Sequence, residues 1–176
     1  MQFKTLPKTA GTLFAMITVA SSPLTAQEEN TSPLDQLRLS AAKADELVVY
    51  EGLPSSQKDE SSLVQELSRK DVVILCSQAF YAPGASASQS PLIREIITDA
   101  DSIKTYSGQK DCGPFHPDYV VCWQVDGISR YIFIGLECGE IIYCSPQVTR
   151  QYDLTADALK KLQVAFQPYA KKRPEN

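Results

Sequence analysis

Apolar residues recur at helical spacing in four segments of the chain. Ser32 and Ser90 each precede a proline, so each combines a side-chain cap with a residue suited to the first helical position. Thr155 is a further cap, and the apolar stripe that follows it extends to Tyr169. We therefore expect helices over residues 32–44 and 59–68, from residue 90 through Ile97, and from residue 155 through Tyr169.

Two longer apolar runs predict a β-hairpin. Residues 119–125 and 129–136 are rich in β-branched and aromatic residues, and Asp126 and Gly127 lie at their junction. Asp-Gly favours the tight primed turn of a hairpin, because such a turn requires positive φ angles at its central positions.

Shorter runs extend the predicted sheet. Residues 47–50 and 103–106 are short and β-rich. Residues 72–76 are continuously apolar, which is typical of a strand buried on both faces, so we interpret Cys76 as a small apolar filler.

The order of these elements predicts an α+β fold, with helices packed on a mostly antiparallel sheet. Residues 141–144 return as a third strand after the hairpin, which gives a meander over residues 118–146. We expect a single α+β domain over residues 32–174, long enough to bury a core without depending on disulfides.

The start of the chain predicts export. Lys4 and Lys8 precede a short apolar segment, residues 11–20, and a tail of small residues follows it. The apolar segment is much shorter than the ~20 residues that a membrane-spanning helix requires. We therefore expect a signal peptide over residues 1–26, a disordered start over residues 27–31, and a periplasmic or secreted mature protein without a membrane span.

The charge balance argues against nucleic acid as a partner. The formal net charge is -4, and removal of the leader with its two lysines makes it -6. Nucleic acid and anionic lipid both require clustered Lys and Arg. The one basic cluster, residues 171–173, lies at the end of the last predicted helix, where cations complement the helix dipole.

The segment CGPFHPDY, residues 112–119, contains the single histidine of the chain. Counting back along the hairpin ladder from its Asp-Gly turn places Tyr119 opposite Ile134 and Phe115 level with Cys138. One end of the sheet then gathers the residues that we propose as a functional loop: Cys112, Phe115, His116, Asp118, Tyr119, Cys138 and Glu140, with Glu137 beside them.

Three chemistries are open to the sulfur atoms of this loop. In an oxidising compartment Cys112 and Cys138 would form a structural disulfide. With His116, and with Asp118 or Glu140 as a fourth ligand, the two thiolates would instead suit zinc or copper. The third possibility is a thiol enzyme or redox protein, in which His116 activates a cysteine and Asp118 orients the ring. His116 could also simply donate a hydrogen bond that holds the loop.

The remaining hairpin cysteines should not pair with each other. Cys122 opposes Tyr131 on the middle strand, and Cys144 lies on the strand beyond it, roughly 9 to 10 Å away. A disulfide requires Cα atoms within about 7 Å. Trp123, on the same strand as Cys122, is interpreted as part of the core or sheet surface and not as a binding platform.

Several motifs resemble a family of uncharacterised exported bacterial proteins, whose pattern reads YEGLPH, then FY, then CGGFHPDY with a tryptophan following, then CFGCGE. The matching pieces of this chain, in the same order, are YEGLP (50–54), AFYAP (79–83), YSGQKDCGPFHPDY (106–119), Trp123, CGE (138–140) and RP (173–174). The resemblance covers nearly the whole mature chain and implies an exported globular domain without an assigned activity.

The chain departs from that pattern at three positions. Pro114 replaces a glycine, Ser55 replaces a histidine, and Gly135 occupies the place of the first cysteine of CFGC. The loss of that thiol removes one sulfur from a tetrahedral zinc site and leaves Cys112 and Cys138 as a natural pair.

We therefore interpret the chain as an exported, non-catalytic binding or structural module whose loop is fixed by the Cys112–Cys138 disulfide. It would carry no cofactor, and its partner would be a ligand or protein that the sequence does not identify. The main alternative is a zinc or copper protein using Cys112, His116 and Cys138. Phosphate loops, dinucleotide fingerprints, nucleophile elbows and HExxH helices are not found in the sequence.

Overall fold

The computed structural model describes residues 31–55, 60–170 and 172–173. The expected signal peptide and most of the expected disordered start lie outside the described residues. Among the helices that are described, none is both long enough and apolar enough to cross a membrane.

Four α-helices are described, and all four match segments expected from the apolar spacing. Ser32 Oγ accepts a hydrogen bond from the Asp35 amide at 3.1 Å, and Thr155 Oγ1 accepts one from Ala158 at 3.3 Å, so two of the expected side-chain caps are present. The helices are α1 (Pro33–Lys43), α2 (Glu60–Leu67), α3 (Pro91–Thr98) and α4 (Ala156–Ala165), with short 3-10 turns η1 (Ala87–Gln89) and η2 (Gln167–Tyr169).

The main sheet has seven strands in the order β4-β1-β6-β7-β8-β9-β5, and every neighbouring pair is antiparallel. The α+β prediction with a mostly antiparallel sheet is therefore confirmed. The strands are β1 (Val48–Glu51), β4 (Ala85–Ser86), β5 (Ile103–Thr105), β6 (Tyr119–Val125), β7 (Ile128–Gly135), β8 (Glu140–Cys144) and β9 (Thr149–Leu154).

The turn at Asp126 and Gly127 sets the register of the meander. Both residues have positive φ, 55° and 73°, as a primed hairpin turn requires. Val125 therefore pairs with Ile128 and Tyr119 with Ile134, which confirms the expected ladder.

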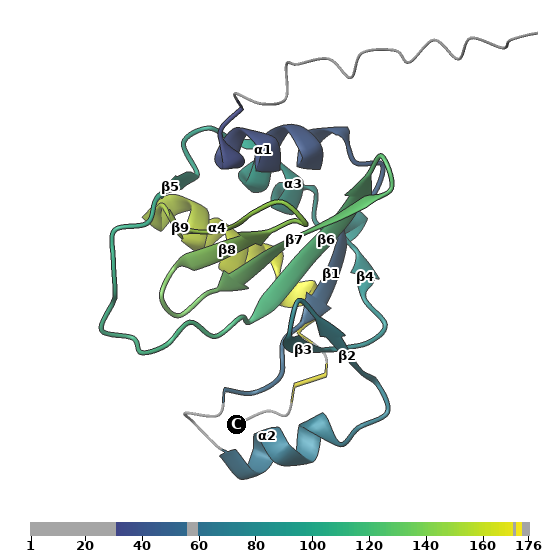
Figure 1. Ribbon diagram of the computed structural model, residues 1–176. Coiled ribbons are helices and arrows are strands. Elements are labelled where there is room, and N and C mark those ends of the chain that lie inside the picture. Colours follow the sequence, from purple (N-terminus) through teal and green to yellow (C-terminus); the bar gives the residue numbers. More distant parts are fainter. Residues whose placement is uncertain (1–30, 56–59, 171, 174–176) are drawn as a thin grey trace, which may run out of the picture. The chain divides into compact units, whose positions relative to one another are not determined.

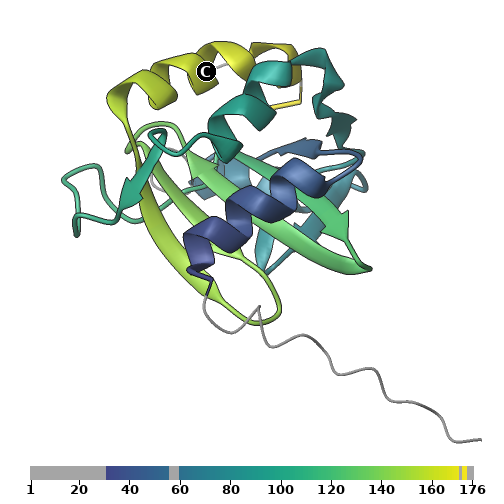
Figure 2. The same cartoon turned by 90° about the horizontal axis from the view of Figure 1, so that it is seen from above.

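The inner face of the main sheet packs against α1, α3 and α4, which Figure 2 shows together on one side of it. Trp123 is 3% exposed on this face and donates its indole N–H to Ser40 Oγ of α1 at 3.2 Å, so its interpretation as a core residue is confirmed. Tyr119 stacks on Phe166 beyond α4, with ring centroids 4.3 Å apart. These contacts hold the strand that follows the candidate loop against the helical layer.

The outer face of the main sheet is covered by a second, two-stranded sheet formed by β2 (Val72–Leu75) and β3 (Gln78–Tyr81). This hairpin and α2 lie together, apart from α1 and α3 (Figure 1). Phe80 of β3 packs on Val120 and Phe133 of the main sheet.

The interpretation of residues 72–76 as a strand buried on both faces is wrong. Ile74 is 61% exposed, because β2 belongs to a surface hairpin that covers the main sheet with one face only. Cys76 is exposed in the turn of that hairpin and is not an apolar filler. A continuous apolar run is compatible with a central strand and with a surface hairpin. Val73 and Leu75 are partly buried in this hairpin, as they would also be in a central strand.

Candidate functional site

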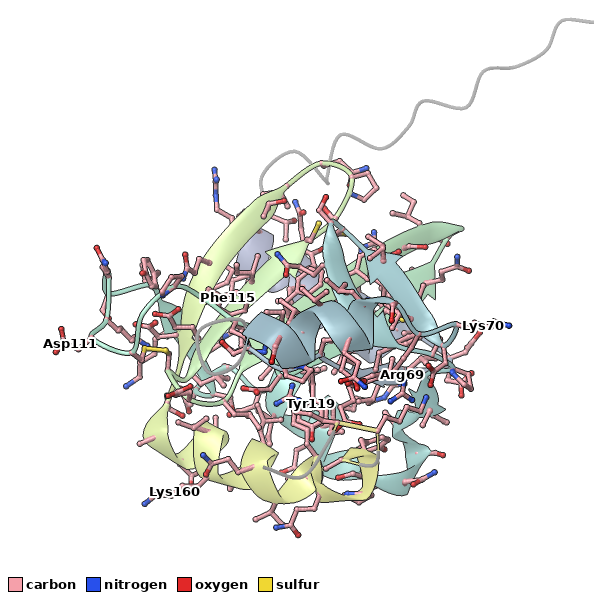
Figure 3. The ribbon with its side chains drawn as sticks, turned by 90° about the horizontal axis from the view of Figure 1, so that it is seen from below. Arg69, Lys70, Asp111, Phe115, Tyr119 and Lys160 are labelled. Carbon is pink, nitrogen blue, oxygen red and sulfur yellow. A yellow bond between two sulfur atoms is a disulfide. The ribbon has the colours of Figure 1, made fainter. Side chains whose placement is uncertain are left out.

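Cys112 and Cys138 form a disulfide, which confirms the expected pairing. Their Cα atoms lie 5.9 Å apart, within the usual range for a disulfide, and 26 positions separate them in the sequence. The bond attaches the irregular segment after β5 to the turn between β7 and β8. Figure 3 shows the yellow sulfur bond beside Asp111, whose side chain projects away from the sheet.

Lys110 attaches the same segment through polar contacts. Its ammonium donates to the Cys138 carbonyl at 2.8 Å and pairs with the Asp153 carboxylate of β9 at 2.9 Å. Asp153 also accepts hydrogen bonds from the amide and hydroxyl of Ser107, at 2.9 and 2.6 Å. Burial alone would raise the pKa of Asp153, but the hydrogen bonds from Ser107 and Lys110 outweigh it and lower the pKa.

Glu140 belongs to this polar cluster and does not line the cavity described below. It is 3% exposed, accepts a hydrogen bond from Gln151 Nε2 at 3.1 Å, and lies 3.9 Å from the Lys110 ammonium. Glu140 thus lies at the end of the sheet that was predicted from the sequence. Its carboxylate, at the start of β8, contacts Lys110 and Gln151 and does not line the cavity.

Asp118 joins three distant parts of the chain. Its Oδ2 accepts the Leu136 amide at 2.7 Å, and its Oδ1 pairs with the Arg173 guanidinium at 3.0 Å. Arg173 also donates to the Gly52 carbonyl from Nε and Nη2, at 3.0 and 2.9 Å. Both side chains of the pair are partly exposed, and their charge-assisted hydrogen bonds join these parts of the chain.

The role expected for residues 171–173 is therefore corrected for Arg173. Helix α4 ends at Ala165, and the chain continues through η2 before Arg173 reaches Asp118. Lys172 binds through its amide to the Glu51 carboxylate at 2.7 Å and through its ammonium to the Pro83 carbonyl at 2.8 Å. The two described cations bind residues at the end of β1, before β4 and before β6, and not the end of α4, and Lys171 lies outside the described residues.

His116 holds the loop to the segment after β1. Its Nε2 lies 3.0 Å from the Leu53 carbonyl oxygen. A carbonyl can only accept, so Nε2 carries the hydrogen and donates it. This contact agrees with the simple role for the histidine, that of fixing the path of the loop.

Phe115 and Tyr119 face opposite sides of the sheet. Phe115 packs against the outer-face cluster around Phe133, whereas Tyr119 is buried in the inner core. Burial, and secondarily the carboxylate of Glu51, raise the pKa of Tyr119 to about 12. Tyr119 is thus a structural residue of the helical side, while Phe115 is one wall of the site.

Two glycines allow the segments to approach closely, and sequence reasoning missed this role in both. A Cβ on Gly52 would overlap the Pro117 carbonyl oxygen, and one on Gly135 would lie 3.0 Å from the His116 carbonyl oxygen and 3.2 Å from the Phe115 ring. The available signal was their position inside the YEGLP and GLEC segments, but a glycine in a strand or turn does not reveal which chain approaches it.

A cavity of about 170 Å³ opens beside the disulfide. It exceeds the 150 Å³ or so of an engineered cavity that admits benzene. Its walls bring together most of the predicted loop with Ser55 from the segment after β1: Ser55, Cys112, Pro114, Phe115, His116, Asp118, Gly135, Glu137 and Cys138.

The disulfide limits the metal and thiol-enzyme alternatives. Cys112 and Cys138 are bonded to each other, so neither sulfur is a thiolate that could bind zinc or copper or attack a substrate. Across the described ranges, no group of three or more His, Cys, Asp and Glu side chains is arranged to hold a metal ion. The zinc or copper alternative with His116 therefore requires prior reduction and stays a prediction.

The other three cysteines are free, and Cys122 is not bonded to Cys144, as expected. Tyr131 lies between them in the ladder, opposite both. Burial raises the pKa of Cys122 to about 11, and partial burial of the sulfur together with the neighbouring Cys144 sulfur raises the pKa of Cys76 to about 12. Both shifts run against thiolate formation.

Comparisons of the chain with protein-family models, with curated proteins and with solved structures gave no match. The resemblance of the motifs to an exported bacterial family stays a prediction.

Proposed function

We propose that this protein is an exported binding module without catalytic activity, and that the cavity beside the Cys112–Cys138 disulfide takes a small ligand. The observation that carries the proposal is the anchoring of the cavity walls. The disulfide, the Asp118–Arg173 pair and the His116 contact with Leu53 hold the walls in place before any ligand arrives. A preformed site loses less conformational entropy on binding.

The lining favours a small amine. Asp118 and Glu137 contribute carboxylates, while Pro114, Phe115 and the disulfide provide apolar surface. Arg173 pairs with Asp118 but does not line the cavity, and the described lining residues include no Lys or Arg, so the charged side chains of the lining are acidic. The negative formal charge of the chain also favours a cationic ligand.

Export is supported by two features. The first residues have the pattern of a signal peptide, and the disulfide is of the kind that persists in oxidising compartments. An exported protein with a preformed cavity would meet its ligand outside the cytoplasm.

Titration with benzylamine, followed by amide NMR shifts, tests the proposal. Benzyl alcohol is the neutral probe of similar shape. We expect benzylamine to shift the amides of the non-proline residues within 112–119 and of residues 136–138, and Glu137→Gln to weaken binding by about two- to fivefold, the usual range for a partly exposed ion pair.

Glu46→Gln is the matched control, because it removes the same charge from an exposed position on a different hollow, lined also by Trp123 and Tyr131. It should leave benzylamine binding unchanged. The proposal fails if neither probe shifts the amides around the disulfide, or if both glutamate variants weaken binding equally.

A further inference from the structure

The turn of the β2–β3 hairpin brings a second pair of sulfur atoms together. Cys76 and Ser77 form this turn with φ angles of 45° and 67°, in the left-handed region that glycine and asparagine usually occupy. The Sγ atom of Cys76 lies 3.2 Å from that of Cys144, at the end of β8. A cysteine in this backbone conformation is uncommon, so its side chain and not its conformational preference accounts for its presence.

Apolar contacts hold the two sulfurs in position. Leu75, the residue before Cys76, packs on the outer-face cluster, and so does Cys144. Phe80 of β3 and Phe133 of β7 join the hairpin to the sheet, with ring centroids 5.8 Å apart. The sulfurs are therefore close because two packed layers meet there and not because of a loose loop.

We propose that Cys76 and Cys144 are a second, reversible disulfide site that closes the β2–β3 hairpin covalently onto the main sheet. An S–S bond is about 2.05 Å long, so the sulfurs need to approach by only about 1.2 Å, a change within reach of side-chain rotation. The exposure of Cys76 gives a reagent access to the pair, unlike a site sealed inside a core.

The reaction is a thiol–disulfide exchange with a disulfide donor, either a small molecule such as oxidised glutathione or an oxidoreductase. The thiolate of one cysteine attacks the donor and releases one donor thiol, leaving a mixed disulfide. The second cysteine then attacks that mixed disulfide and releases the other donor thiol. Two protein thiols lose two electrons and two protons, and the donor disulfide gains them.

The low acidity of Cys76 slows its attack on a donor. Partial burial of its sulfur, the hydrogen bond shared with Cys144 and the charge of the Cys144 sulfur raise the pKa of Cys76 to about 12. Very little Cys76 thiolate forms at neutral pH, so an attack by Cys76 requires a reactive donor.

Cys122 is a built-in control on the same face of the sheet. Cys122 is in β6 and Cys144 is in β8, and Tyr131 of β7 lies between them. Cys122 is half-buried. A reagent that oxidised cysteines without regard to geometry would also modify Cys122, whereas a site formed by proximity leaves it free.

The experiment is oxidation of the purified chain in glutathione buffers of increasing oxidised fraction, with free thiols trapped by maleimide and peptides mapped without reduction. We expect the three free thiols to fall to one, with Cys122 the residue that remains. A cross-linked peptide containing Cys76 and Cys144 should appear beside the Cys112–Cys138 peptide, and the melting temperature should rise by several degrees.

Variants separate the outcomes. Cys76→Ser and Cys144→Ser should each abolish the new cross-link and the rise in melting temperature, while Cys122→Ser should keep both. The inference is overturned if Cys76 and Cys144 remain as open to maleimide as Cys122 throughout the series, or if Cys76 is recovered only in covalent dimers or bonded to Cys122.

Discussion

Strand β8 has a pair of sulfur atoms at each end, and the two pairs differ in what surrounds them. Cys112–Cys138, just before the strand, is bonded and lies among ionic and hydrogen-bonded contacts. Cys76 and Cys144, at its other end, are free with their Sγ atoms 3.2 Å apart; Cys144 packs on the apolar outer-face cluster, and Cys76 is exposed in the turn of the hairpin.

The difference follows from the segments that the two pairs attach. The segment before Cys112 is irregular from residue 106 onward, so a covalent bond and side-chain contacts replace the ladder that it lacks. The β2–β3 hairpin has its own backbone ladder and a hydrophobic face, so it packs on the sheet without a covalent bond. We therefore expect a disulfide to contribute more to stability where regular backbone pairing is missing than where it is present.

The largest effect should come from removing the bonded pair. Cys112→Ala, Cys138→Ala and the double variant should each lower the free energy of unfolding by about 3 to 4 kcal/mol, as expected for a loop of this length. Because all three lose the same bond, their effects should be equal and not additive. Urea denaturation measures this, and Cys122→Ala is the control for a half-buried cysteine. A loss below about 1 kcal/mol would show that the polar contacts suffice alone.

A smaller effect should come from the ion pair behind the loop. Asp118→Ala leaves Arg173 without its carboxylate and the Leu136 amide without its acceptor, and should cost about 2 kcal/mol. A double-mutant cycle with Arg173→Ala isolates the pair, and a positive coupling energy in urea denaturation is expected. Additive effects would mean that the two side chains act independently.

The pH dependence of stability tests the contacts of Asp153. Its pKa is lowered in the folded protein, so it contributes stability above the unfolded value of about 3.9 and loses that contribution as pH falls through the lower folded value. Asp153→Asn should therefore be less stable than the wild type at neutral pH and lose less stability on acidification. Thermal melts across this acidic range measure the difference, and parallel curves for the two proteins would contradict it.

The smallest effect on stability should come from the turn of the β2–β3 hairpin. Ser77→Gly relieves a positive φ angle and should stabilise the protein by about 0.5 kcal/mol, after the entropy lost by glycine is subtracted. Ser129→Gly, placed in strand β7, should destabilise it instead. If urea denaturation shows that both serine variants lower the free energy of unfolding, the turn of the β2–β3 hairpin is not strained.

The parts of the fold that were predictable from the sequence depend on local chemistry. The Asp126-Gly127 turn determined the register of the hairpin, and that register brought Cys112 and Cys138 to one rim. Strand β9 was not predicted, because its sequence TRQYDL is mostly polar and pairs at a partly exposed position. The proximity of Cys76 to Cys144 was missed because a continuous apolar run hid the turn.

Contacts between remote residues left no local signal. Arg173 binds Asp118 across 55 positions and Gly52 across 121, and neither separation has a periodicity that could reveal it. The carboxylate of Asp118 was correctly placed at the site, but its partner was assigned to a helix terminus. Long-range polar pairs depend on the final packing of the chain, which the spacing of residues does not encode.

The junction at Gly52 has a consequence for the order of assembly. Its carbonyl receives the Arg173 guanidinium, its amide donates to the Asp118 carbonyl at 2.7 Å, and it also bridges to Phe80. A chain emerging from its N-terminus can form β1 and the hairpins early, yet this three-way meeting point has to wait for residue 173. The walls around His116 are therefore completed only after residue 173 has been synthesised, so a shorter nascent chain would present an unfinished pocket.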